Sequence, residues 1–77
     1  MHDATPVNDQ SDVIKKLKKC GFVFDRYAKG SHEIWYNSDT KRRVTVPNHP
    51  GVDIPKGTLR AIIKESGYSV EEFVRLR

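Results

Sequence analysis

The hydrophobic positions of this chain change their spacing along the sequence, and each change marks a new element. Near the start, apolar residues recur at helical spacing behind a typical N-cap residue, Ser11, and ahead of a typical helix stop, Gly21. This pattern predicts a helix over residues 12–20. Three short segments rich in aromatic and β-branched residues follow, and they read FVFDRYA, HEIWYN and RRVTVP. They predict three antiparallel strands joined by short turns at residues 30–31 and 37–40.

Helical spacing returns in the last third of the chain. A second helix is predicted from Pro55, in its first turn, to Gly67, with Leu59, Ile62 and Ile63 as its buried stripe. The sequence SVEE has the capping-box pattern and predicts a short third helix that directs Val70, Phe73 and Val74 inward. The predicted fold is α+β in the order α-β-β-β-α plus a short C-terminal helix. The helices lie on one face of a three-stranded antiparallel sheet.

The ends and the length of the chain set its expected organisation. Residues 1–10 are polar, contain Pro6 and show no period, which predicts a poorly ordered leader before a single domain over residues 11–77. No apolar run approaches the roughly 20 residues of a membrane span. The first residues also lack the basic and apolar regions of a signal peptide. We therefore expect a cytoplasmic protein without a membrane partner.

Alternation along the second predicted strand separates two sets of side chains. His32, Ile34 and Tyr36 share one face of the sheet, and Glu33, Trp35 and Asn37 share the other. Tryptophan has the larger apolar surface, so we expect Trp35 to point toward the helices and His32 to lie on the open face. Ile34 would then be the apolar residue on which a covering partner packs. The opposite register would bury His32 and Ile34 and expose Trp35.

Charge and cysteine content narrow the classes of partner. The net charge is +4, and residues 13–77 carry 14 basic and 7 acidic side chains. This surplus favours a polyanionic partner, either nucleic acid or an acidic protein. The candidate basic surfaces are the outer face of the first helix, with Lys15, Lys16, Lys18 and Lys19, and the run Lys41-Arg42-Arg43. A single cysteine, Cys20, excludes an intramolecular disulfide and is expected in the core.

Three segments, KKLKKCGF, KGSHEIWY and VTVPNHPGVDIPKGTLRAIIKESG, together resemble the HicA family of toxins over residues 11–68. These toxins are small mRNA interferases of type II toxin–antitoxin systems. The resemblance implies a double-stranded-RNA-binding-domain-like fold, which agrees with the element order above. It also implies that the histidine after Gly-Ser, here His32, is catalytic, and that a HicB-like antitoxin covers the active face. His49 matches the family's loop histidine.

The residues around His32 suit RNA cleavage without a metal or another cofactor. A ribose 2′-hydroxyl is the nucleophile, and a neutral histidine can accept its proton near pH 7. His32 is the expected general base, alone or alternating between base and acid, with a 2′,3′-cyclic phosphate as product. The expected RNA-binding residues are Lys29, Ser31, Tyr36, His49 and Arg43. No two histidines have the short spacing of zinc ligands, so no metal site is expected.

Several roles stay open from sequence alone. Lys29 either stabilises the charge of the phosphate or is a solvated turn residue. His49 is either the general acid of the reaction or a structural residue. Tyr27 and Tyr36 either stack on unpaired bases or pack as strand aromatics. The chain itself has two other interpretations. One is a non-catalytic RNA-binding domain of the double-stranded-RNA-binding-domain-like fold, and the other is a module whose basic surface serves only an acidic protein.

Overall fold

The computed structural model describes residues 9–49 and 51–76. The elements are helix α1 (Gln10–Lys19), strands β1 (Val23–Tyr27), β2 (Glu33–Asn37) and β3 (Arg42–Val46), and helices α2 (Lys56–Ser66) and α3 (Val70–Val74). A short 3-10 turn, η1 (Lys29–Ser31), replaces a simple turn between β1 and β2. The strands form one antiparallel sheet in the order β1-β2-β3. The predicted element order and α+β class are confirmed.

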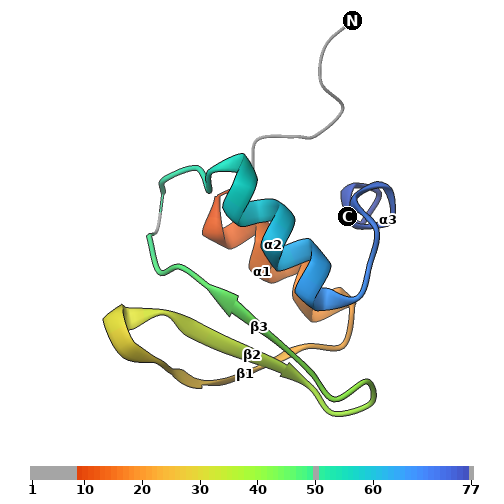
Figure 1. The fold of residues 1–77 in the computed structure, drawn as a ribbon, viewed down its shortest axis with the longest axis horizontal. Helices are drawn as coiled ribbons and strands as arrows, with labels where there is room; N and C mark the ends of the chain where they lie inside the picture. Colours follow the sequence, from red (N-terminus) through yellow and green to blue (C-terminus); the bar gives the residue numbers. More distant parts are fainter. Residues whose placement is uncertain (1–8, 50, 77) are drawn as a thin grey trace, which may run out of the picture.

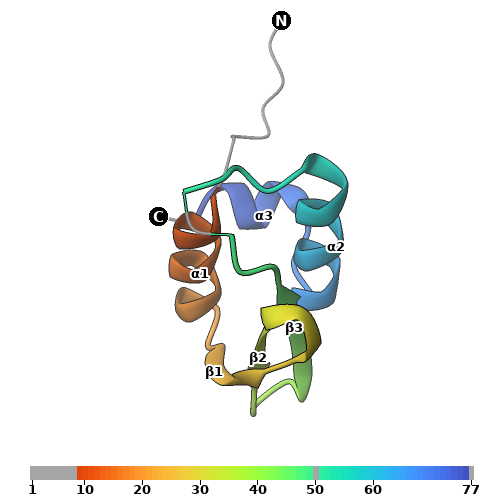
Figure 2. The same cartoon turned by 90° about the vertical axis from the view of Figure 1, so that its left-hand side faces the viewer.

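The helices form a layer over one face of the sheet. Helices α1 and α2 lie side by side above the strands, and α3 lies on the side of this layer away from the sheet (Figures 1 and 2). The core lies between the layers and includes side chains from α1, β2, β3, α2 and α3 but none from β1 or η1. Its most deeply buried members are Val13, Leu17, Phe22, Val44, Val46, Ile62, Ile63 and Phe73.

Strand β2 adopts the predicted orientation. Trp35 is buried beneath the helices with 5% of its surface exposed, whereas Ile34 and Tyr36 are half-buried on the other face. The indole N–H of Trp35 donates to Glu33 at 2.9 Å. The prediction that Trp35 anchors the strand to the helices is confirmed, and Ile34 lies on the open face.

The start of α1 differs from the prediction. Asp9 is the N-cap residue instead of Ser11, because the Asp9 carboxylate accepts the Asp12 N–H at 3.0 Å and the Asp12 carboxylate returns the bond to the Asp9 N–H. Gln10 is buried and donates to Glu33 at 2.8 Å, which ties the first turn to the sheet. The helix therefore begins two residues earlier than predicted. Residues 1–8 of the predicted leader lie outside the described residues.

The lysines of α1 do not form one outer face. Lys16 is half-buried, with its ammonium 3.4 Å from the Val74 carbonyl oxygen and 5.5 Å from the centre of the Phe73 ring. Burial lowers the pKa of Lys16, although the nearby Asp12 carboxylate opposes that change. The contact of α1 with α3 is thus partly made by a residue that was predicted to be solvent-exposed.

The remaining differences are small and lie at the edges of the core. Val70 is 39% exposed and Val74 is half-buried, so only Phe73 of the three predicted α3 residues is fully buried. A helix of five residues is too short to direct a wide stripe toward the core. Helix α2 begins at Lys56, and Pro55 is its N-cap residue instead of a first-turn residue. Cys20 packs against the core but is half-buried.

Candidate active site

A cavity of about 330 Å³ brings together the end of the sheet and the start of α2. His32 comes from the connection between β1 and β2, His49 from the loop after β3, and Thr58 from the first turn of α2. The other lining residues are Pro47, Val52, Asp53, Ile54 and Pro55. Residues from three separate parts of the chain therefore meet at this cavity, and they include both histidines of the described residues.

His32 lies directly before β2, and the backbone of η1 determines where its ring sits. Gly30 and Ser31 both adopt positive φ angles, of 77° and 65°. Two left-handed residues in succession turn the chain back on itself, so that the Ala28 N–H donates to the His32 carbonyl oxygen at 2.6 Å. This compact turn holds His32 in a half-buried position at the cavity wall.

The turn also determines which ring nitrogen of His32 is free. Nδ1 lies 3.0 Å from the Lys29 carbonyl oxygen. A carbonyl oxygen can only accept, so Nδ1 must carry the proton of this hydrogen bond. In the neutral ring Nε2 is then the unprotonated nitrogen. The side chain is thereby arranged as a proton acceptor.

The position of His32 differs from the prediction in one respect. Alternation placed it on the open face of the sheet beside Tyr36, but His32 precedes the first strand residue, Glu33, and η1 turns it toward the loop after β3. In the β2–β3 ladder Glu33 pairs with Val46, so the residue before Glu33 lies at the same end of the sheet as Pro47. The rule of alternation does not extend past the end of a strand.

Tyr36 and Arg43 lie together, but away from the cavity. They are register partners on β2 and β3, and the Arg43 guanidinium lies 4.8 Å from the centre of the Tyr36 ring. Tyr36 lies four positions after His32, and at the rise of an extended chain this corresponds to a distance of roughly 13 Å along the strand. Because Arg43 already covers one face of this ring, a base could stack there only after the arginine moves.

Lys29 and Ser31 are exposed in η1, beside His32 but not among the residues that line the cavity. Lys29 contributes its carbonyl group to the position of His32. The predicted site residues thus divide into three groups: the two cavity histidines, the η1 pair, and the Tyr36–Arg43 pair on the open face.

Sequence reasoning missed two polar residues of the cavity, Asp53 and Thr58. Both lie within the run from Val46 to Leu59 that carries the family resemblance, which was the only available signal for them. Helix α2 also has no side-chain cap hydrogen bond at its N-terminus, and Pro55 and Thr58 from this end line the cavity. The positive end of the helix dipole therefore lies at the cavity wall.

The described residues contain neither a metal-binding cluster nor a membrane-spanning helix. In residues 9–49 and 51–76, no group of three or more histidine, cysteine or acidic side chains is arranged to hold a metal ion. No helix within the same ranges has the length and apolar character needed to cross a bilayer.

The fold and the site define a class of protein: a small basic α+β domain in which loops bring two histidines to one cavity. The family described as "HicA toxin of bacterial toxin-antitoxin" matches residues 11–68 of the 77. The chain therefore belongs to the HicA toxin family of toxin–antitoxin systems. A search of the curated proteins finds no match.

Proposed function

We propose that this toxin is a metal-independent endoribonuclease that cleaves mRNA with His32 as its proton-transfer group. The observation that carries the proposal is the hydrogen bond from His32 Nδ1 to the Lys29 carbonyl oxygen, which leaves Nε2 as a proton acceptor. The family match supports the role of a toxin, and the cavity gives a phosphodiester access to the ring.

In the proposed reaction His32 Nε2 removes the proton of a ribose 2′-hydroxyl. The resulting oxygen attacks the adjacent phosphorus, the bond from phosphorus to the 5′-oxygen breaks, and the products are a 2′,3′-cyclic phosphate and a 5′-hydroxyl. The 5′-oxygen receives a proton either from His49, the other histidine of the cavity, or from His32 itself. One positioned proton-transfer group contributes about 10²- to 10⁴-fold in rate, so a slow enzyme is expected.

Positive charge near the cavity would stabilise the phosphorane. Lys29 is the nearest lysine in sequence to His32 and is exposed in η1, and the N-terminal end of α2 lies at the cavity wall. Lys29, Ser31 and His49 are the proposed contacts to RNA close to the scissile bond. Arg43 and Tyr36 are proposed contacts on the open face, where Arg43 would bind phosphate.

The toxin family implies an antitoxin partner in general, and we propose that this partner is HicB-like. It would cover the open face of the sheet, which no described helix covers and on which Ile34 is half-buried (Figure 1). Burial of Ile34 by the antitoxin would hide the apolar side chain and also cover Tyr36 and Arg43, the proposed RNA contacts of the open face.

The test compares wild type, His32→Ala and His49→Ala on purified mRNA in EDTA, with end-group analysis of the fragments. Wild type should yield 2′,3′-cyclic phosphate ends, and His32→Ala should cleave about 10²- to 10⁴-fold more slowly. If His49→Ala loses a comparable amount of activity, His49 is the general acid. If His49→Ala keeps full activity, His32 serves as both base and acid. Products that end in a 3′-hydroxyl, or a fully active His32→Ala, would exclude the mechanism.

A further inference from the structure

Strand β1 carries two aromatic side chains that the helices leave uncovered. All five residues of β1 are exposed, and Phe24 and Tyr27 have 44% and 63% of their surfaces exposed. Residues three apart normally point to opposite faces of a strand, but a register shift between Phe24 and Arg26 changes this. Phe24 pairs with Trp35 and Tyr27 pairs with Glu33, and both partners are buried under the helices.

The bulge therefore places both rings on the helix side of the sheet. Their centres are 5.0 Å apart at an interplanar angle of 64°, and the Phe24 ring also contacts Trp35 edge-on at 5.9 Å. Aromatic side chains with this much exposure, gathered on one face, mark a binding surface more often than a random surface position does.

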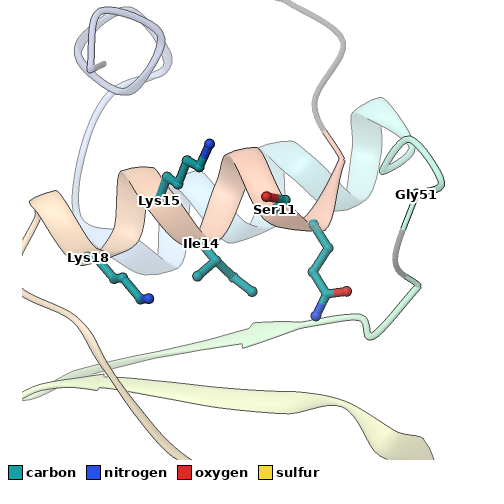
Figure 3. Close-up of a pocket in the computed structure, with 6 residues that line it drawn as sticks. Ser11, Ile14, Lys15, Lys18 and Gly51 are labelled. Carbon is teal, nitrogen blue, oxygen red and sulfur yellow. The ribbon is translucent and has the colours of Figure 1, made fainter.

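Helix α1 approaches this surface through the Trp35 ring. A cavity of about 350 Å³ on α1 is lined by Gly51 and by α1 residues, among them Ile14 and Lys18, and by no residue of β1. Figure 3 shows Ile14 and Lys18 pointing from α1 toward the strands. The Lys18 ammonium lies 5.9 Å from the centre of the Trp35 ring, which in turn contacts Phe24. We call the surface formed by Ile14, Lys18, Phe24 and Tyr27, which the Trp35 ring links, the α1–β1 surface.

The α1–β1 surface ends beside the candidate active site. Tyr27 pairs with Glu33, the residue that directly follows His32. The next residue of the chain, Ala28, donates its N–H to the His32 carbonyl oxygen at 2.6 Å. Tyr27 therefore lies at the same end of the sheet as the turn that carries His32.

We propose that the α1–β1 surface binds the single-stranded RNA next to the scissile bond, with bases stacked on Phe24 and Tyr27 and a phosphate bound by Lys18. This inference rests on the proposed function and names where its substrate lies. Exposed aromatic rings stack on any base, and lysines beside them neutralise the backbone. Tyr36, the tyrosine of the open face, already has Arg43 over its ring, so the α1–β1 surface is the better platform. The Lys18 ammonium suits a polyanion, and the position beside His32 favours the substrate over a protein.

The experiment measures RNA affinity in a His32→Ala background, which separates binding from cleavage. A fluorescein-labelled, unstructured oligoribonucleotide is titrated and followed by anisotropy. Adding Tyr27→Ala should raise Kd by roughly 5- to 100-fold, the range for loss of one stacked base, whereas Tyr27→Phe should not. Val23→Ala is the matched control, because Val23 is on the same strand and 61% exposed but pairs with Tyr36 on the open face.

Salt dependence separates the two kinds of contact. Lys18→Gln should reduce the slope of log K against log salt by about 0.7, the value for one phosphate contact of a single strand, while Tyr27→Ala should leave the slope unchanged. Tyr27 lies outside the buried core, so its truncation should leave the thermal unfolding curve close to that of the parent.

The proposal is overturned if Tyr27→Ala and Val23→Ala bind RNA equally well, whether or not the wild type cleaves RNA. It is also overturned if Tyr27→Ala keeps its RNA affinity but loses binding to an acidic antitoxin, since the α1–β1 surface would then be a protein-docking surface. Cleavage that fails while Tyr27-dependent RNA binding persists would refute the catalytic proposal alone.

Discussion

Gly30→Ala should disturb the ring of His32 from a neighbouring position in the chain. Gly30 has φ of 77°, and a methyl group at its Cβ position would lie 3.3 Å from His32 Nδ1. Two separate costs follow. The left-handed backbone costs an L-residue about 1–2 kcal/mol, and the methyl group requires the imidazole to move by a few tenths of an ångström.

Gly51→Ala separates these costs. Gly51 has the same φ of 77°, but an added Cβ would meet no atom within 4 Å. Both variants should therefore lose about 1–2 kcal/mol of unfolding free energy, or several degrees of melting temperature for a domain of this size. Only Gly30→Ala should also lose activity. A misplacement of about 1 Å can cost 10²-fold, so a smaller shift of His32 should cost roughly tenfold.

The assay has two parts: thermal unfolding by circular dichroism, and the initial rate of RNA cleavage at a temperature at which both variants are folded. Equal cleavage rates for Gly30→Ala and Gly51→Ala would show that the contact with His32 Nδ1 does not position the ring for catalysis. An unchanged melting temperature in both would instead refute the assignment of left-handed backbone strain.

Four further predictions concern stability. Phe73→Ala should cost about 3–5 kcal/mol in chemical denaturation, because Phe73 is 1% exposed and belongs to the single core; no measurable loss would show that α3 is dispensable. Gln10→Ala should cost about 1–3 kcal/mol by leaving the buried Glu33 carboxylate short of a donor, while Ser11→Ala, next to it and exposed, should be within about 0.5 kcal/mol of wild type. Lys41→Gly should raise the unfolding free energy by about 0.5–1 kcal/mol, since Lys41 holds φ of 64° in the β2–β3 turn; a lower melting temperature would contradict this. Hydrogen bonds from Ser69 hold the pKa of Glu72 below its ordinary value. The Ser69–Glu72 capping box should therefore stabilise α3 fully above the unfolded pKa of Glu72 and weaken as pH falls through the lower folded pKa, which amide exchange at Ser69 can follow in wild type and Glu72→Gln.

The type and order of the elements were predictable because each depends on residues that are close together in the sequence. Helical spacing marks α1 and α2, and the capping box at Ser69 marks α3. Asn37 shows why the second turn was equally clear: its side-chain oxygen accepts the N–H groups of Asp39 and Thr40 at 2.9 and 3.2 Å, a bond pattern that depends only on neighbouring residues.

The boundaries were less predictable where a distant contact decided them. Asp9 and Ser11 are both good N-cap residues, and no rule of local sequence chooses between them. In the structure α1 begins at Gln10, and the Gln10 side chain donates a hydrogen bond to Glu33, which lies 23 residues further along the chain. Lys16 is similar, since its inward position depends on where α3 packs.

The sequence by itself determined the α+β class, the burial of Trp35 and the candidacy of His32, because periodicity, residue size and a local motif specify each of them. Only the tertiary structure decided that His32 lines one cavity with His49 and the start of α2 instead of lying beside Tyr36. It alone revealed that Phe24 and Tyr27 share one face of the exposed strand β1, because a bulge turns Tyr27 to the face of Phe24. Both features arise from the meeting of segments far apart in the chain, and no local pattern encodes such a meeting.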